Sequence, residues 1–196
     1  ALLRRSGARQ AELPSKQTPL IERQTLVDGL RQAVAPGGPY AGWSPLMLAA
    51  WRGQGDLIPN LTSEPGLLNQ VDAAGHSPLT RAAYNGDETT VRAVLEAGAK
   101  INLPGLKASA LYWAAEQGKL RAVKVLLAAG AKPDEGSLEG LTPLLIAARH
   151  NAGDIALALL DSGANPNVTD TQNVTPLMEA VIHGDARLLA KLLRHG

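Results

Sequence analysis

Residues 140–164 read GLTPLLIAARHNAGDIALALLDSGA, and this stretch decides the fold because its pattern recurs along the chain. A Ser/Thr-x-Leu segment followed by a pair of small residues occurs five times, beginning at Ser44, Ser77, Ser109, Thr142 and Thr175. Successive copies are separated by 33, 32, 33 and 33 residues. A constant period of this length indicates a chain built from stacked copies of one supersecondary unit.

Each copy predicts two short helices joined by a turn. A Ser or Thr suits the N-cap, and the Pro that follows it in four copies suits the first helical position, where no amide donor is needed. A second apolar stripe follows with i, i+3, i+4 spacing, as in Ala156, Leu159 and Leu160. Gly163 then stands where a helix C-terminus favours a residue that tolerates positive φ. The copy therefore reads as loop, helix, turn and helix.

These motifs resemble the ankyrin-repeat family, whose signature is matched by Thr142-Pro143-Leu144, Ala147-Ala148, Leu159-Leu160 and Gly163-Ala164. The resemblance covers residues 39–196. It implies an all-α solenoid of stacked helix-turn-helix units with hairpin loops, whose concave face of hairpin tips and inner helices binds protein partners. The expected repeats are about 39–71, 72–103, 104–136, 137–169 and 170–196.

The N-terminal region departs from the period. Residues 1–17 are expected to form a flexible arm, although their three arginines leave open a basic patch for an acidic partner. Residues 18–38 are predicted to form a capping helix that Thr18-Pro19 opens, because terminal repeats need atypical caps. The chain starts at Ala1 rather than Met, which suggests that an initiator Met, a targeting segment or added sequence is missing. The stop at Gly196 leaves open that more chain follows.

Three copies carry local exceptions. In the first, Pro59 should either start the second helix or break it, because proline inside a helix costs about 3 kcal/mol or more. The apolar residues around Pro59 are then expected to pack irregularly. In the third, Ala110 replaces the Pro and Lys107 stands where Gly is expected. In the fourth, Asn151 replaces the Gly between the helices, a mild change because Asn tolerates the left-handed conformation.

Composition excludes several function classes. The net charge is +1 and acids and bases are interleaved, so the sequence carries no electrostatic footprint for nucleic acid. It contains no apolar run of transmembrane length, and no integral membrane segment is expected. Cysteine is absent, which excludes disulfides, thiolate nucleophiles and zinc sites built on sulfur.

Aromatic residues mark the candidate binding surface. All six fall in a loop tip or an inner helix, and Trp51 and Tyr84 occupy equivalent positions in adjacent repeats. Exposed Trp and Tyr are enriched at interface hot spots, so we predict a partner-binding patch centred on repeats one to three. The alternative is that these rings fill space between repeats, and this alternative is favoured for Tyr112. The predicted partner-binding residues are Tyr40, Trp43, Trp51, Arg52, His76, Arg81, Tyr84, Asn85, Trp113, Gln117, Arg149 and His150.

The position that Trp113 occupies in its repeat is interpreted as outward-looking, since the other copies place Leu48, Arg81, Ile146 and Glu179 there. No catalytic constellation is recognisable. His150 and His183 hold equivalent positions without a third metal ligand, and the serines of the motif are accounted for as helix caps. The chain is therefore predicted not to be an enzyme and to use no cofactor, metal or small-molecule substrate.

Two functional hypotheses follow. The first is a protein-interaction module that binds a folded partner such as a toxin, an enzyme or a regulator. Its narrower version rests on a resemblance to small stand-alone bacterial ankyrin proteins and predicts an inhibitor or immunity protein that neutralises a toxin or enzyme. The narrower version places the protein in the periplasm, with the cytoplasm as the alternative. The second hypothesis is a scaffold or regulatory fragment of a longer protein.

Overall fold

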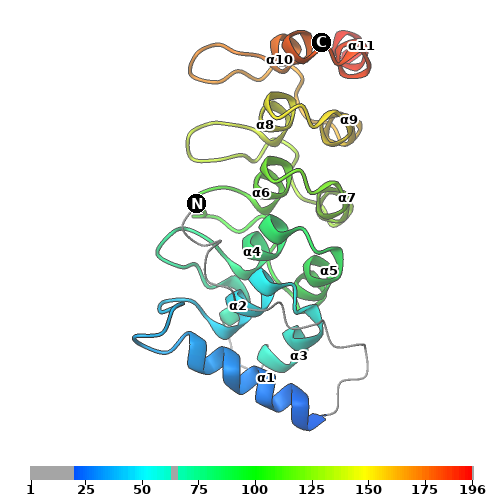
Figure 1. Ribbon diagram of the computed structural model, residues 1–196. Helices are drawn as coiled ribbons and strands as arrows, with labels where there is room; N and C mark the ends of the chain where they lie inside the picture. Colours follow the sequence, from blue (N-terminus) through cyan, green and yellow to red (C-terminus); the bar gives the residue numbers. More distant parts are fainter. Residues whose placement is uncertain (1–19, 63–65, 196) are drawn as a thin grey trace.

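The computed structural model describes residues 20–62 and 66–195, and it confirms an all-α array of stacked helix pairs (Figure 1). No β-strand occurs among these residues, where the only extended pairing outside the helices is an isolated bridge between Ala108 and Ser137. In chain order the elements are α1 (Leu20–Ala33), α2 (Pro45–Arg52), the 3₁₀ turn η1 (Gly55–Leu57), α3 (Ile58–Leu61), the 3₁₀ turn η2 (Leu67–Asn69), α4 (Pro78–Asn85), α5 (Glu88–Glu96), α6 (Ala110–Glu116), α7 (Leu120–Ala128), α8 (Pro143–Arg149), α9 (Gly153–Asp161), α10 (Pro176–His183) and α11 (Ala186–His195).

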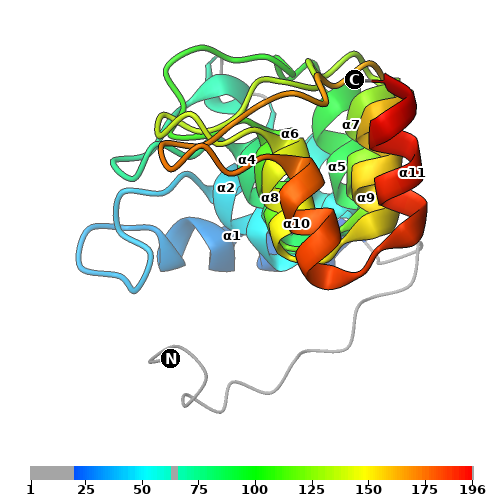
Figure 2. The same ribbon diagram turned by 90° about the horizontal axis from the view of Figure 1, so that it is seen from above.

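The helices form two rows. Helices α2, α4, α6, α8 and α10 make an inner row, and α3, α5, α7, α9 and α11 make an outer row behind it (Figure 1). The loops between successive repeats project to the same side of the stack (Figure 2). The inner row and the loops together therefore form one continuous surface along the array.

The repeated motif works as the sequence predicts at the start of every inner helix. Ser44, Ser77, Ser109, Thr142 and Thr175 each cap a helix and accept a hydrogen bond from the backbone N–H three residues later. At the other end, Asn151 has a φ of 54°, so it adopts the left-handed conformation that glycine adopts in the equivalent turns. Asn151 thus takes the place of the glycine without a change in the backbone conformation of the turn.

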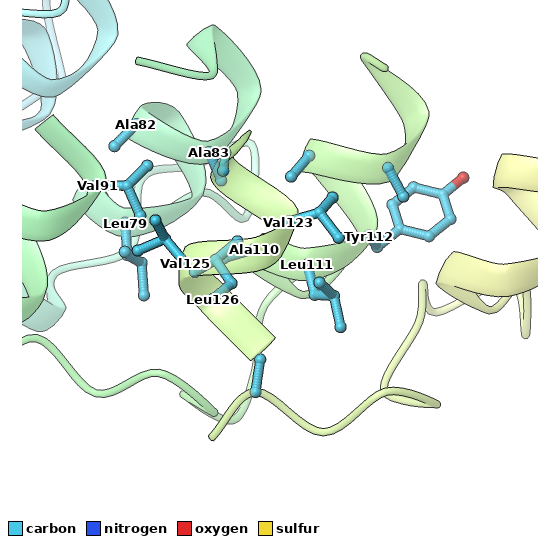
Figure 3. Packing of buried hydrophobic residues seen from close by; sticks show 14 of the residues in the cluster. Leu79, Ala82, Ala83, Val91, Ala110, Leu111, Tyr112, Val123, Val125 and Leu126 are labelled. Carbon is cyan, nitrogen blue, oxygen red and sulfur yellow. The ribbon is translucent and has the colours of Figure 1, made fainter. Parts of the chain in front are cut away.

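Small residues allow the inner helices to approach one another. The paired alanines of the second, third and fourth copies are buried, and Figure 3 shows Ala82 of α4 beside Val91 of α5. The outer helices contribute their apolar stripe to the same core, as Val91 and Val123 are fully buried. Burying a side chain of this size stabilises the fold by roughly 1.5–3 kcal/mol.

The N-terminal end of the array is covered by α1. Val27 and Leu30 of this helix are buried and pack into the same core as α2. In the first repeat the structure agrees with the first of the two alternatives for Pro59: η1 runs into α3, which begins at Ile58 and has Pro59 in its first turn. The residues expected to pack irregularly there, Leu57, Ile58 and Leu61, are all buried. The predicted arm at 1–17 and the Thr18-Pro19 cap lie outside the described residues.

Candidate functional site

Five aromatic rings form a continuous ladder across the first three repeats. The ring centroids are 5.5 Å apart for Tyr40 and Trp43, 6.1 Å for Trp43 and Trp51, 5.1 Å for Trp51 and Tyr84, and 5.8 Å for Tyr84 and Trp113. These separations lie in the range that favours aromatic pairs by about 0.5–1.5 kcal/mol each. The predicted proximity of Trp51 and Tyr84 is therefore correct. We call these five residues the aromatic ladder.

Two further rings extend the ladder at Trp113. The centroid of the His76 imidazole lies 4.8 Å from that of the Trp113 ring, and the centroid of the Tyr112 ring lies 5.6 Å from it. Tyr112 is buried, so its expected role in the core is confirmed. The ladder residues are half-buried, which leaves part of each side chain open to solvent while its neighbours hold it in place.

Arg81 joins the ladder to a hairpin loop. Its guanidinium carbon lies 3.9 Å from the centroid of the Trp43 ring, a cation–π geometry, and its Nη2 donates to Oδ2 of Asp72. The Asp72 carboxylate also accepts hydrogen bonds from the backbone N–H groups of Ala74 at 2.9 Å and His76 at 3.0 Å. One carboxylate thus holds the hairpin and fixes the arginine beneath the tryptophan.

The outward-looking interpretation of the position shared by Trp113 is wrong. Leu48, Ile146 and Glu179 occupy this position in other repeats and are buried, while the Arg81 side chain is only 12% exposed. Side chains of neighbouring repeats cover the position, as Tyr84 and His76 do for Trp113. The spacing along one repeat does not reveal this cover, because it comes from the stacking of the repeats.

Burial and charge shift the titration of two groups beside the ladder. Burial raises the pKa of Asp72. The hydrogen bonds from Arg81 and from the backbone of His76 and Ala74, together with the charge of Arg81, lower it by more than burial raises it, so the pKa lies below its ordinary value of 3.8. Burial and the charge of Arg81 lower the pKa of His76, although Asp72 opposes this shift. At neutral pH the site therefore contains a charged Asp72–Arg81 pair beside a neutral imidazole.

We expect Asp72 to make the protein less stable in acid. Because its pKa is lower in the folded state than in the unfolded chain, the ion pair contributes its full stability above about pH 5 and loses it as pH falls through the folded pKa. Urea unfolding of the natural chain and of Asp72→Asn across this range measures the effect. The stability difference between the two proteins should shrink as the pH falls, and a difference that is constant with pH would contradict the assignment.

The fourth and fifth repeats carry a second ionic group on the inner row. Arg149 donates from Nη2 to Oδ2 of Asp170 at 2.5 Å and from Nε to Oε1 of Glu179 at 3.2 Å. Burial lowers the pKa of Arg149, but these two hydrogen bonds raise it above its ordinary value. Asp170 also accepts from the backbone N–H of Val174 at 2.9 Å, so it holds its hairpin as Asp72 holds the earlier one.

Side chains at one repeated position connect neighbouring repeats. Asn85 donates from Nδ2 to the carbonyl oxygen of Trp51 at 2.5 Å, and Nδ1 of His150 lies 3.1 Å from the carbonyl oxygen of Glu116. His183 repeats the arrangement with Nε2 3.0 Å from the carbonyl oxygen of Arg149. A carbonyl oxygen only accepts, so the ring nitrogen of each histidine donates. This position therefore links repeats in addition to any binding role.

The structure brings most of the predicted partner-binding residues together on the first three repeats. Arg52 adds its guanidinium to the ladder at 5.5 Å from the Tyr40 ring centroid. Gln117 donates to its neighbour Glu116, while Arg149 and His150 belong to the later repeats.

Sequence reasoning missed the acids of the site, namely Asp72, Asp170 and Glu179. A signal for the first two exists in the chain. Each aspartate precedes by three positions a residue with positive φ, Gly75 at 81° and Asn173 at 61°, and an Asp at the start of a tight turn commonly bonds its own backbone. Glu179 has no comparable local signal, because its partner comes from the previous repeat.

Three buried nitrogens of this region have no hydrogen-bond partner within the described residues: Nε1 of Trp113, Nδ1 of His76 and Nε of Arg81. A buried donor without a partner costs about 1–3 kcal/mol. The buried polar atoms of this region are therefore less completely hydrogen-bonded than those of an ordinary core.

Metal and membrane chemistry receive no support from the described residues. No group of three or more His, Asp or Glu among them is placed to hold a metal ion. None of the helices in the described part combines the length and the apolar character that a membrane crossing needs.

Comparison with known proteins finds similar repeats in one family model and in several animal proteins. A family model described as "Ankyrin repeats (3 copies)" matches residues 46–137 and again residues 111–196. Palmitoyltransferase Hip14 of Drosophila melanogaster is 35% identical over 127 residues, which make up 63% of this chain and 20% of that protein. Ankyrin repeat and SOCS box protein 3 of Homo sapiens is 32% identical over 101 residues, or 50% of this chain and 20% of that protein. Inversin of Gallus gallus is 31% identical over 97 residues, or 49% of this chain and 9% of that protein. The chain spans a fifth or less of the length of these relatives.

Proposed function

Because this chain belongs to the ankyrin-repeat family, we propose that it is a protein-interaction module that binds a folded protein through the aromatic ladder and the hairpin tips beside it. The observation that carries the proposal is the unbroken contact of half-buried rings from Tyr40 to Trp113. Trp, Tyr and Arg are the residues most enriched at interface hot spots, and this surface combines all three.

The rigidity of the ladder supports the proposal. Each ring contacts at least one other, and Arg81 is fixed by both Asp72 and Trp43, so few rotamers remain to be lost when a partner docks. Ordering a flexible side chain at an interface costs about 0.5–1.5 kcal/mol, and a preorganised surface avoids that loss. The partner is expected to present a surface that packs against flat aromatic faces.

The finer hypotheses concern the setting of this module. An inhibitor or immunity protein that neutralises a toxin or enzyme in the periplasm is one, with the cytoplasm as the alternative location, and the animal origin of the relatives does not favour it. The second is a scaffold or regulatory segment of a longer protein. The relatives are at least about five times longer than the matched region, which favours the second hypothesis.

We expect Tyr84→Ala to weaken partner binding at least tenfold, which corresponds to about 1.4 kcal/mol. Tyr84 is the better choice because it bridges Trp51 and Trp113, whereas Trp51 also packs against the core and its loss would lower stability. The measurement is recovery of a stoichiometric partner from native extract, followed by titration of that purified partner. Circular dichroism at the assay temperature checks that the variant is folded.

Arg92→Ala is the matched control for this test. Arg92 lies on α5 in the same repeat and is exposed, and within the described part of the chain it forms an ion pair with Glu88 one turn away. This substitution should leave affinity unchanged. Equal affinities of the natural chain and the folded Tyr84→Ala variant, or a loss caused by Arg92→Ala alone, would move the binding site away from the ladder.

A further inference from the structure

A small cleft lies between the hairpin loops that precede α6 and α8, on the side of the stack to which the loops project (Figure 2). Its volume is about 260 Å³, and its lining includes Leu103, Pro104, Leu106, Glu135, Ser137 and Leu138. Backbone hydrogen bonds join the two loops, from Ser109 N–H to the Gly136 carbonyl at 3.2 Å and from Leu138 N–H to the Lys107 carbonyl at 2.9 Å. We call this feature the hairpin cleft.

A departure from the repeat period accompanies the hairpin cleft. The spacing from Ser77 to Ser109 is 32 residues, one fewer than the spacing between the other copies, so the loop before α6 is one residue shorter than the loop before α8. Gly105 stands in the shorter loop with a φ of 80°, and a Cβ there would meet nothing within 4 Å. The shorter loop therefore leaves room beside its longer neighbour.

One carboxylate oxygen at the hairpin cleft lacks a partner. Glu135 lines the cleft, and its Oε2 is buried without a hydrogen-bond partner among the described residues. A buried polar atom without a partner is costly, and more so when it is charged. A donor that reached this oxygen would therefore form a strong, charge-assisted hydrogen bond.

The other hairpins show which donor this chain pairs with such acids. Asp72 in the hairpin before α4 binds the guanidinium of Arg81, and Asp170 in the hairpin before α10 binds that of Arg149. At Glu135 no guanidinium from the described residues donates to Oε2. The arrangement at the cleft thus resembles the other two without the arginine.

The size and lining of the hairpin cleft favour a single long side chain. Sites for drug-sized ligands have volumes of about 300–1,000 Å³, and the cleft is smaller than these. The apolar side chains of Leu103, Leu106 and Leu138 suit the methylene stem of an arginine, whose charged end can reach a carboxylate while the stem packs on apolar surface. Leu138 is 82% exposed, so part of this apolar surface faces solvent. Lys107 belongs to the shorter loop but does not line the cleft.

We propose that the hairpin cleft receives an arginine side chain of a protein partner, whose guanidinium donates to Oε2 of Glu135. The loop of residues 129–142 carries three acids, Asp134, Glu135 and Glu139, and one base, so its charge complements that of the arginine. Arginine suits the cleft better than lysine because its guanidinium is less strongly hydrated and offers several donors in a fixed geometry. This site goes beyond the proposed binding at the aromatic ladder, because no ladder residue lines the cleft.

The test is an NMR titration of the ¹⁵N-labelled chain with Nα-acetyl-arginine amide. The backbone amide signals of Leu106, Gly136 and Leu138 should shift and reach saturation. Nα-acetyl-citrulline amide has nearly the same shape without the charge, and it should bind at least about fivefold more weakly, because hydrogen bonds between charged groups are stronger than neutral ones. Nα-acetyl-lysine amide should bind more weakly than the arginine probe.

Three variants locate the binding group, with circular dichroism as the check on folding. Glu135→Gln should raise the dissociation constant of the arginine probe at least about fivefold and should remove the preference over citrulline. Glu139→Gln is the matched control, since it removes the same charge from an exposed residue of the same loop, and it should change the constant less than about twofold. Leu138→Ser should weaken binding at least about twofold through the lost apolar contact.

Four outcomes would overturn the proposal. Equal affinities for the arginine and citrulline probes would remove the role of the charge, and equal losses in Glu135→Gln and Glu139→Gln would leave only a general field of the loop. Saturable shifts at the same amides with Mg²⁺ or Ca²⁺ but not with the arginine probe would make a divalent cation the occupant. Dimerisation of the natural chain that Glu135→Gln abolishes would make a second copy the occupant. Tyr84→Ala should leave arginine binding unchanged, so this proposal and the one for the aromatic ladder fail separately.

Discussion

Arg81→Ala should lower the free energy of unfolding by about 3 kcal/mol, because it leaves a buried carboxylate without its charged partner. The Asp72 side chain is only 3% exposed, so water does not replace the lost guanidinium. The substitution also removes the cation that lies 3.9 Å from the centroid of the Trp43 ring. Urea unfolding at neutral pH measures the loss, and the melting temperature should fall by roughly 6–12 °C.

Arg92→Ala tests the same change at a much more exposed ion pair. The Arg92 and Glu88 side chains are 55% and 37% exposed, and their pair joins residues one helical turn apart. A pair of this kind contributes about 0.3–0.5 kcal/mol, so the two substitutions should differ several-fold. If both variants lost the same stability, burial of the Asp72–Arg81 pair would not be the cause. Near-ultraviolet circular dichroism should change for Arg81→Ala alone, because only Arg81 contacts a tryptophan.

The period made the fold predictable because it encodes local requirements. Ser109 caps α6 although Ala110 replaces the usual proline, so the hydroxyl and the apolar stripe suffice to place the helix. Pro59 likewise marked a helix start in the first repeat, because its missing amide hydrogen is tolerated in a first turn. These are properties of a few neighbouring residues, and a single sequence displays them directly.

The candidate site was predictable only where the register itself creates the contact. Trp51 and Tyr84 hold the same position in adjacent repeats, so stacking the repeats brings their rings to 5.1 Å. Arg81 was predicted to lie in the binding patch, but its burial beneath other side chains could not be predicted. Its partner Asp72 lies in a hairpin and Trp43 precedes the previous inner helix, and no period relates the three. Contacts that depend on how loops fold back escape an argument from spacing.

Gly136 shows the same limit for a backbone position. The repeat pattern draws attention to Gly140, two residues before Thr142, where φ is +79°. Gly136 belongs to no repeated motif and does not have a positive φ. The structure nevertheless places the hairpin so tightly that a Cβ on Gly136 would lie 1.8 Å from the carbonyl oxygen of Leu141. The requirement for glycine here is one of space, and it arises only once the hairpin has closed.

Gly136→Ala is therefore expected to lower the free energy of unfolding by about 3 kcal/mol, at the upper end of what overpacking usually costs. The backbone must open, which disrupts the hydrogen bond from Ser109 N–H to the Gly136 carbonyl at 3.2 Å and the one from Ser137 N–H to the Leu141 carbonyl at 2.9 Å. Gly140→Ala is the matched control: a Cβ there meets nothing within 4 Å, so only the left-handed backbone opposes it, at about 1 kcal/mol. Urea unfolding ranks the two variants, and hydrogen exchange at Ser109 and Ser137 should accelerate for Gly136→Ala alone. A larger loss for Gly140→Ala would mean that backbone conformation, rather than the closed hairpin, limits this loop.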